Sequence, residues 1–538
     1  MKVLTAAEMR EVDRLTTERF GISSLQLMET AGTLVAEAFR EIADRAGLKP
    51  RTIYVLCGKG NNGGDGFVAA RHLRPVFESV RVVLFAQPDE LRGDAATNFQ
   101  RWRELGGEVM FARDEKAWAD ISSKVLGADA VLDAIFGTGF RGVAPGAIGR
   151  AIQEINHFSH EVTSTWLPLI LAVDTPSGLP ADGQAAEGPV LRAHQTVTFT
   201  APKVGQLVSR DAAAVGSLRV VNIGSPVALV EEIGKKTLRW SEPDEFADMP
   251  LVRQSDGHKG LYGHILVIAG SQGKSGAAVM AGYGALRSGA GLVTVATPDV
   301  VLPIVAAAHP EYMTEPLLST DAGAVSRENL AGDRFSRIVE GKSVLAIGPG
   351  LGQHAETQEF IRAIVKRVDV PIILDADGLN AFAGQADKLR ERKCEFLAVT
   401  PHPGEMARLL GSVTTSVQED RVKTAQEAAK RWNAHVILKG AHTIVAAPDG
   451  RTLINTTGNA GLAKGGSGDV LTGILAALTG QFKTDDWLQV LALGVYLHGV
   501  AADLAVEGTD PSGLLASEVA AAVPAARREL LRGLQRRG

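Results

Sequence analysis

The stretch TIYVLCGKGNNGGDGFVAARHL (residues 52–73) places an apolar, β-branched run directly before a glycine-rich turn, and we expect a helix to begin near Phe67. This order recurs along the first half of the chain, where the runs VRVVLF, AVLDAIF and LILAVD alternate with helical or loop stretches. Such alternation is typical of a parallel sheet with helices on both faces. The sequence therefore predicts an α/β fold.

The length of 538 residues indicates two large domains, because single hydrophobic cores stop growing at roughly 250 to 300 residues. Between Asn222 and Gly260 the alternation breaks into a stretch with Pro, Gly and mixed charge. Beyond it the alternation restarts with the run HILVIAG. We therefore predict a first domain over residues 1–222, a linker over 223–245 and a second α/β domain over 246–538.

Composition excludes several classes of protein. Hydrophobic residues make up 45% and charged residues 22%, with a net charge of −5, so nucleic acid is a poor partner. The two cysteines, Cys57 and Cys394, are too far apart in sequence for a CxxC pair. Charges interrupt the N-terminus, and no uninterrupted apolar run of eighteen residues occurs. We expect a cytoplasmic homo-oligomer without a membrane or nucleic-acid partner.

The first glycine-rich turn, GKGNNG (residues 58–63), matches the GxGxxG pattern of dinucleotide-binding folds. That pattern also needs an acid at the end of the next strand, where this chain has Ala86, Gln87 and Pro88. A dehydrogenase site is therefore disfavoured, although a plain tight turn stays possible. Glycine amides at a helix start suit a phosphate, and Asn or Asp oxygens suit a hard cation.

Two further acids follow predicted strands. Asp133 lies in AVLDAIF before another glycine-rich turn, and Asp174 ends LILAVD. Ligands of open α/β sheets bind beyond the carboxyl ends of the strands. We therefore expect the loops with Asn62, Asp133 and Asp174 to meet at one crevice.

The motifs GNNGGDG, LDAIFGTG, AVDTPSG and TFTAPKVG, in this order, resemble an NAD(P)H-hydrate epimerase domain. The resemblance implies a Rossmann-like α/β/α sandwich, a potassium ion held by Asn62, Asp133 and Ser177, and Asp174 as the acid or base. Lys203 would bind phosphate or act electrostatically, unless it is an ordinary solvated lysine. Substrate contacts are implied for Asn61, Asn62, Gly63, Gly64, Asp65, Gly137, Thr138, Gly139, Phe140, Arg141, Gly142, Val143 and Asp174.

In the second half, NAGLAKGGSGD (residues 459–469) leads directly into the apolar run VLTGILAAL. Glycines at a helix start can aim backbone N–H groups at a transferring phosphoryl group, and Asp469 could accept a hydroxyl proton. The alternative is that Asp469 only caps the helix. A P-loop is excluded at Gly273, Lys274 and Ser275, because its first glycine would have to replace Ile268.

The motifs HKGLYGHILVIAGS, SGAG, IGPGLG, DADGLN, TPHPGE, KGAHT and GGSGD resemble the ADP- or ATP-dependent NAD(P)H-hydrate dehydratases, which implies a ribokinase-like domain. Magnesium is expected with the nucleotide phosphates, without named protein ligands. His402 could also be purely structural. The hydrate would contact Ala277, Gly350 or Gly352, His402 and Asp469, and the adenylate would be held by Lys439, Gly440, Ala441, His442, Thr443 and Gly468.

Together these resemblances imply the repair of NADHX and NADPHX, in which a hydroxyl group sits on carbon six of the reduced nicotinamide ring. The first domain would interconvert the R and S hydrates. The second would dehydrate the S hydrate at the expense of ADP or ATP, because a phosphorylated hydroxyl leaves more readily than hydroxide. The alternative is a ribokinase-like small-molecule kinase with a non-catalytic, nucleotide-binding N-terminal domain.

Overall fold

The computed structural model describes residues 1–538 except 46, 159–167, 235–237, 483, 485 and 536–538. The chain forms two compact units, one of residues 2–236 and one of residue 1 with residues 237–538. The stretch 223–245, which we expected to be a linker, instead contributes to both units. Its helix α8 (Val227–Ile233) packs on α1 in the first unit, and its strand β8 (Leu238–Trp240) joins the sheet of the second. Both elements are too short to produce a readable hydrophobic period.

The first unit contains a seven-stranded sheet in the order β3-β2-β1-β4-β5-β6-β7. All of its pairs are parallel, as the alternating pattern predicted. The strand order reverses between β1 and β4, so the loops that follow these two strands flank the natural ligand crevice. The strands are β1 (Thr52–Cys57), β2 (Ser79–Leu84), β3 (Val109–Phe111), β4 (Ala130–Ala134), β5 (Leu169–Val173), β6 (Gln195–Phe199) and β7 (Ser217–Val221).

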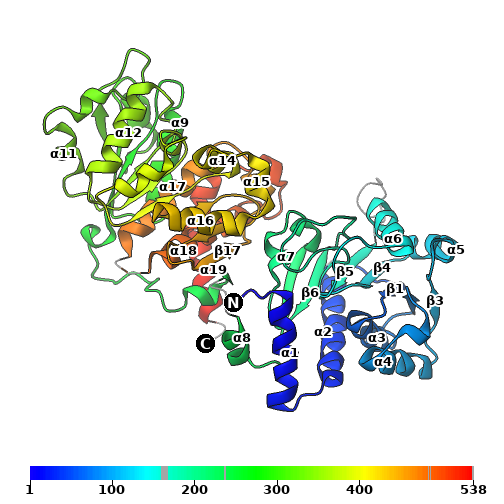
Figure 1. Cartoon of the computed structure of the whole chain (residues 1–538). Helices are drawn as coiled ribbons and strands as arrows, with labels where there is room; N and C mark the ends of the chain where they lie inside the picture. The colour runs from blue at the N-terminus through cyan, green and yellow to red at the C-terminus, as the bar shows by residue number, and fades with distance from the viewer. Residues whose placement is uncertain (46, 159–167, 235–237, 483, 485, 536–538) are drawn as a thin grey trace. The chain divides into compact units, whose positions relative to one another are not determined.

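Helices cover both faces of this sheet (Figure 1). Alternate side chains of β1 point to opposite faces: Ile53 and Val55 pack with α2, α3 and α4, whereas Tyr54 and Leu56 pack with α5 and α6. The helix α1 starts with the predicted capping box of Thr5 and Glu8. The helices are α1 (Ala6–Phe20), α2 (Ser24–Arg45), α3 (Asn61–Leu73), α4 (Gly93–Glu104), α5 (Glu115–Leu126), α6 (Gly146–Asn156) and α7 (Val204–Val208).

The start of α3 corrects our expectation of a helix beginning near Phe67, because the helix already begins at Asn61. Its glycines obscure this start, since glycine has a low helix propensity. They are needed for close packing: a Cβ on Gly63 would lie 2.0 Å from the carbonyl oxygen of Gly58, and one on Gly66 would lie 2.6 Å from Ala134 Cβ. The glycine-rich stretch is thus the first turns of a helix pressed against the sheet.

The second unit contains a ten-stranded sheet in the order β11-β10-β9-β12-β13-β14-β15-β16-β17-β8. The pairs from β11 to β15 are parallel, both pairs of β16 are antiparallel, and β8 runs parallel to β17. The strands are β9 (His264–Ile268), β10 (Leu292–Pro298), β11 (Met313–Leu317), β12 (Val344–Ile347), β13 (Ile372–Leu374), β14 (Leu397–Val399), β15 (His435–Leu438), β16 (Thr443–Ala446) and β17 (Thr452–Asn455).

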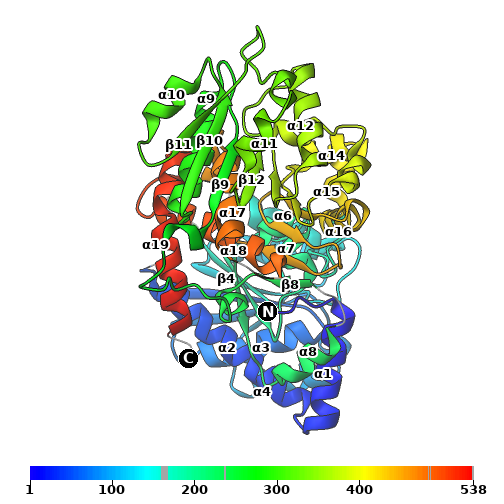
Figure 2. The same cartoon turned by 90° about the vertical axis from the view of Figure 1, so that its left-hand side faces the viewer.

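One face of this sheet packs on α9, α17, α18 and α19, through side chains such as Ile265 and Val267. Helices that include α12, α14 and α16 lie on the other side of the sheet (Figure 2). The helices are α9 (Ser275–Arg287), α10 (Leu302–Ala308), α11 (Arg334–Val339), α12 (Ala355–Arg367), α13 (Asp377–Asn380), α14 (Pro403–Leu410), α15 (Thr414–Glu419), α16 (Arg421–Trp432), α17 (Ser467–Gln481), α18 (Trp487–Ala505) and α19 (Ala516–Gln535).

The helix α18 is long and apolar. Within the part of the chain that the structure describes, it is the one helix long and apolar enough to cross a membrane by length and composition. Most of that stretch is buried in the core of the second unit, where residues such as Leu491 and Val495 pack on the sheet and its neighbours. Its apolar character is accounted for by this position in the core.

Candidate active sites

Asp133, at the end of β4, is completely buried and is bound by the turn that follows β5. Its carboxylate accepts hydrogen bonds from the Ser177 backbone N–H at 2.7 Å and from Ser177 Oγ at 2.6 Å. The Ile135 N–H donates a third at 3.2 Å. Burial raises the pKa of Asp133 to about 6, although the bonds from Ser177 act in the opposite direction. Asp133 and Ser177 thus form one buried polar pair.

Asn62, in the first turn of α3, is linked to the Asp133–Ser177 pair by hydrogen bonds through Phe136, which follows β4. Its Nδ2 donates to the Phe136 carbonyl at 2.9 Å, and the Phe136 N–H donates to Ser177 Oγ at 2.9 Å. Asn62 Oδ1 is buried and accepts no hydrogen bond from any described residue. A buried oxygen without a donor is an available ligand for a cation. The three residues predicted to hold potassium therefore lie in one connected group.

Asp174 follows β5 and forms a buried ion pair with Lys203. Asp174 Oδ1 accepts from Lys203 Nζ at 2.7 Å and from Thr198 Oγ1 at 3.0 Å. Asp174 Oδ2 accepts from the Thr138 N–H at 3.2 Å. Lys203 is only 1% exposed, so the alternative that it is a solvated surface lysine is wrong. Its ammonium group instead forms an ion pair with the carboxylate of Asp174.

Gly137 lies where the loops after β1, β4 and β5 meet. A Cβ placed on it would lie 3.2 Å from both Asn62 Oδ1 and Asp174 Oδ2. The structure therefore brings the group of Asn62, Asp133 and Ser177 and the Asp174–Lys203 pair close to the same glycine. The absence of a side chain leaves that space open.

Other predicted residues of this loop region take different positions. Gly63 and Gly64 are buried in α3, where a Cβ on Gly64 would lie 2.5 Å from Met28 Sδ. As glycines, they can offer only backbone groups to a ligand. Phe140 stacks on Phe136 with ring centroids 4.4 Å apart. Val143 is 54% exposed. The far half of the loop, Gly139, Arg141 and Gly142 included, thus lies outside the buried cluster.

One acid of this region was not predicted from the sequence. Asp13, on α1, has a buried Oδ1 that no described residue contacts by a hydrogen bond. Burial raises its pKa to about 6, which Lys203 opposes and Asp174 reinforces. Burial likewise raises the pKa of Asp65, with Asp174 and Asp13 adding repulsion. An acid among the buried positions Met9, Val12 and Thr16 of α1 was the available signal.

In the second unit, Asp469 lies in the first turn of α17. The N-cap of this helix is Gly466, with φ of 96°, and no side chain of the described chain caps it by a hydrogen bond. The helix-capping alternative for Asp469 is therefore not supported. Burial raises the pKa of Asp469 to about 7; the charge of Asp375 adds to this effect and that of Lys439 opposes it.

The buried Asp375 and the partly buried Lys439 form a second ion pair close to that helix start. Asp375 Oδ1 accepts from Lys439 Nζ at 2.8 Å and from Thr400 Oγ1 at 2.6 Å. Asp375 Oδ2 accepts from Thr472 Oγ1 at 2.7 Å. A Cβ on Gly468 would lie 3.5 Å from Lys439 Nζ, so the ammonium group is beside the glycine-rich turn. The motif DADGLN contained Asp375, but nothing in the sequence showed its partners.

His402 is the N-cap residue of α14, which supports the structural role that we left open. Its Nδ1 accepts from the Gly404 N–H at 3.1 Å and from the Glu405 N–H at 3.4 Å. Burial lowers its pKa. Its side chain is still 50% exposed, so the ring is also accessible to a ligand.

The remaining predicted residues lie in loops that follow strands, except Ala277 in α9 and Thr443 at the start of β16. Gly350 lies against Ala277, with 2.8 Å between a Cβ on Gly350 and Ala277 Cβ, and its carbonyl accepts from Ser271 Oγ at 2.7 Å. The Gly352 N–H donates to Asp377 Oδ2 at 2.8 Å. Thr443 Oγ1 donates to the Gly440 carbonyl at 3.3 Å. Gly440, Ala441 and His442 connect β15 to β16, which begins at Thr443.

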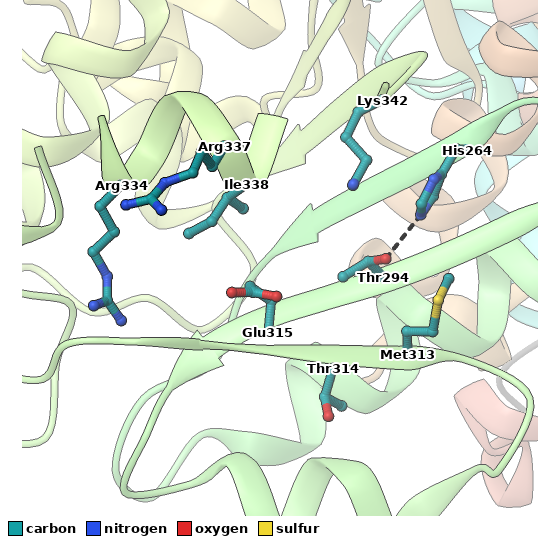
Figure 3. A pocket seen from close by; sticks show the side chains of 9 residues that line it. All are labelled: His264, Thr294, Met313, Thr314, Glu315, Arg334, Arg337, Ile338 and Lys342. Atoms are coloured by element: carbon teal, nitrogen blue, oxygen red, sulfur yellow. Dashed lines mark hydrogen bonds between the residues drawn. The ribbon is translucent and has the colours of Figure 1, made fainter. Parts of the chain in front are cut away.

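A cavity of about 600 Å³ in the second unit lies at the amino ends of the strands, whereas the predicted site residues follow their carboxyl ends (Figure 3). His264 starts β9 and Met313 starts β11, and the His264 ring is 2.8 Å from Thr294 Oγ1. None of the predicted site residues lines it. Its lining residues are His264, Thr294, Met313, Thr314, Glu315, Arg334, Arg337, Ile338 and Lys342.

Comparison with known proteins identifies the family. Residues 24–205 match the family described as YjeF-related protein N-terminus, and residues 265–525 match the family described as NAD(P)H-hydrate dehydratase. The bifunctional NAD(P)H-hydrate repair enzyme Nnr of Moorella thermoacetica is 42% identical over 534 residues, covering 98% of this chain and 97% of that protein. The chain belongs to the bifunctional NAD(P)H-hydrate repair enzyme family.

A second curated relative agrees with this assignment. The NAD(P)H-hydrate repair enzyme Nnr of Escherichia coli K12 is 35% identical over 520 residues, covering 96% of this chain and 92% of that protein. A solved ADP/ATP-dependent NAD(P)H-hydrate dehydratase from Bacillus subtilis, co-crystallized with ATP/Mg²⁺, is 31% identical and covers 54% of this chain and 98% of its own, with a TM-score of 0.46. The two family matches fall in separate units of the repair-enzyme chain. The resemblance inferred from the motifs is therefore confirmed, and the small-molecule kinase alternative is not favoured.

Proposed function

We propose that this chain repairs NADHX and NADPHX, with epimerisation of the R and S hydrates in the first unit and ADP- or ATP-dependent dehydration of the S hydrate in the second. The supporting observation is the setting of Asp469. This partly buried carboxyl group, whose pKa is raised to about 7 by burial, lies at a glycine-rich helix start near the Lys439 ammonium group. A base with this pKa can accept a hydroxyl proton at neutral pH.

In the proposed dehydration, the terminal phosphoryl group of the nucleotide is transferred to the hydroxyl oxygen on carbon six. The P–O bond of the nucleotide breaks, a new P–O bond forms, and Asp469 takes the hydroxyl proton. The C6–O bond then breaks as phosphate leaves, and solvent water takes a proton from carbon five, which restores the ring double bond. The N–H groups from about Gly466 to Asp469 are suited to the phosphoryl oxygens. Magnesium would neutralise charge on the phosphates.

In the proposed epimerisation, Asp174 exchanges a proton at the same hydroxyl group of the hydrate. Lys203 and Thr198 hold its Oδ1, while Oδ2 faces the loop around Gly137. When Asp174 carries a proton, it can give that proton to the hydroxyl group, so that the C6–O bond breaks and water leaves; water then forms a new C6–O bond on the other face and returns the proton to Asp174.

A potassium ion in the first unit is also part of this proposal. Asn62, Asp133 and Ser177 would hold it, and the unpaired Asn62 Oδ1 fits a cation. Asn62, Asp133 and Ser177 offer only oxygen ligands, and such ligands suit a hard ion better than zinc. We further propose that the protein is located in the cytoplasm. We also propose that it forms a homo-oligomer, and light scattering would measure this assembly.

The test is to mix chemically hydrated NADH with the protein and follow the return of the dihydronicotinamide absorbance. We expect recovery only when ADP or ATP is present, and separate reactions with each nucleotide give the preference. Consumption of nucleotide with release of a stable phosphate ester, and without recovery of absorbance, would indicate a small-molecule kinase instead.

A further inference from the structure

Asp375 ties together four elements around the start of α17. It follows β13, and its carboxylate accepts from Thr400 after β14, from Lys439 after β15 and from Thr472 on α17. It is 1% exposed. A buried carboxylate that receives three donors in this way restrains the position of each donor, because a donor that moves away leaves the buried charge with one hydrogen bond fewer.

The ammonium group of Lys439 is the charged donor of this set. Its Nζ lies 2.8 Å from Asp375 Oδ1 and 3.7 Å from Glu405 Oε2, and it adjoins Gly468. Thr472, the third donor, lies one helical turn after Gly468, and its Oγ1 is also 3.1 Å from the Gly468 carbonyl oxygen. The carboxylate therefore fixes both Lys439 and the first turn of α17, relative to one another.

We propose that Asp375 is a positioning residue, which holds the Lys439 ammonium group at the phosphoryl end of the nucleotide site. This deepens the proposed function and rests on it. In this position Lys439 stabilises the negative charge of the transferring phosphoryl group and does not serve the adenine ring. A compact ammonium group suits a phosphate as a point charge, whereas adenine carries no charge to match it.

Direct magnesium ligation by Asp375 is the main competing role for a buried aspartate near a nucleotide. The contacts argue against it, because an ammonium group 2.8 Å from Oδ1 would repel a divalent cation from the same carboxylate. Magnesium can instead keep water and phosphate oxygens as ligands. Asp375 therefore acts through Lys439.

The test compares Asp375→Asn, Lys439→Met and the double variant with the parent chain. We expect each single change to lower kcat of dehydration by about a hundredfold to a thousandfold, as expected for loss of a preorganised charge at a transition state. The double variant should be no slower than Lys439→Met alone, because the two residues act as one unit. Lys423→Met, which removes an exposed lysine of α16, is the control and should leave kcat unchanged.

Calorimetry with ATP and with adenosine provides a second measurement that needs no hydrate. Affinity for ATP should fall in both single variants, while affinity for adenosine stays within about threefold of the parent, since adenosine has no phosphate. Equal losses for both ligands would place Lys439 at the nucleoside and overturn the proposal. Additive losses of kcat in the double variant would also overturn it.

Folding must be checked on the same proteins by thermal unfolding. Asp375→Asn leaves the partly buried Lys439 without its nearest carboxylate and with only Glu405 Oε2 at 3.7 Å, whereas the double variant removes the Asp375 and Lys439 charges together and should unfold closer to the parent. Thr472→Val removes a single bond to Asp375 and should lower kcat by less than about tenfold. If the parent binds ATP but does not restore the dihydronicotinamide, the repair function fails while the ATP and adenosine measurements still decide the role of Asp375.

Discussion

At the scale of single residues, Asp174 combines an unusual backbone conformation with a buried charge. Its φ is 61°, a left-handed conformation that few residues other than glycine adopt, and its carboxylate pairs with Lys203 at 2.7 Å. Such strain persists only where the surrounding structure holds the residue in place. The carboxylate Oδ2 of this residue lies beside Gly137 and accepts from the Thr138 N–H.

We predict that Asp174→Asn lowers epimerisation by about a hundredfold or more, because a positioned acid or base is lost. It should also lower the free energy of unfolding by about 3–5 kcal/mol, since Lys203 remains buried without its partner. Isomer exchange without nucleotide and thermal unfolding measure the two effects. The double variant with Lys203→Met should recover stability but not activity. A folded Asp174→Asn protein that exchanges isomers at the parent rate would remove Asp174 from the mechanism.

For Asp469, we predict that the pH dependence of kcat/KM reports a base. The pKa of about 7 is above the usual value of 3.8, so the group is protonated below pH 7 and the rate should rise with pH until it levels off above about 8. Asp469→Asn should lose this activity at every pH. Affinity for the nucleotide should stay within a few-fold, because the helix start at Gly466 does not depend on the Asp469 side chain. A variant that turns over normally would show that the chemistry lies elsewhere.

Several residues of both sites could not be predicted from the sequence. The motifs located Asp133, Asp174 and Asp469, because each acid follows a strand or a glycine-rich turn. Asp13 and the partners of Asp375 were missed, since their roles arise from burial and from contacts between distant segments. Such contacts depend on strand order, which hydrophobic patterns do not specify.

At the scale of elements, the strands with β-branched runs were predictable, as were α1 and α2, from apolar spacing and a capping box. The start of α3 was not predictable. The six helical residues before Phe67 include three glycines, and glycine has a low helix propensity. The short elements α8 and β8 were also hidden in the expected linker. In each case tertiary packing outweighs a weak local preference.

We predict that Gly63→Ala destabilises the first unit and impairs epimerisation. The new Cβ would lie 2.0 Å from the Gly58 carbonyl oxygen, so α3 must move away from the β1 turn and shift Asn62 with it. The cost should be about 1–3 kcal/mol or more. Gly60→Ala is the matched control, because a Cβ there meets nothing within 4 Å and its φ is −92°. Equal unfolding temperatures for the two variants would contradict this account.

At the scale of the whole molecule, each unit has its own sheet and its own core. We therefore predict that damage in one site leaves the other activity within about twofold of the parent. An equimolar mixture of the Asp174→Asn and Asp469→Asn proteins should convert both isomers to the dihydronicotinamide when nucleotide is present. Coupled assays of hydrate mixtures measure this. Failure of the mixture, with both proteins folded, would indicate that each chain needs its two sites together.

The pairing of β8 with β17 also has a consequence for synthesis on the ribosome. The first strand of the second sheet, Leu238–Trp240, pairs with Thr452–Asn455, which is translated more than two hundred residues later. At roughly 5–20 residues per second, β8 waits about 10 to 40 s for its partner. The first unit needs no segment beyond residue 236 and can fold during that interval. The order of the two units along the chain thus lets one finish while an unpaired strand of the other is still exposed.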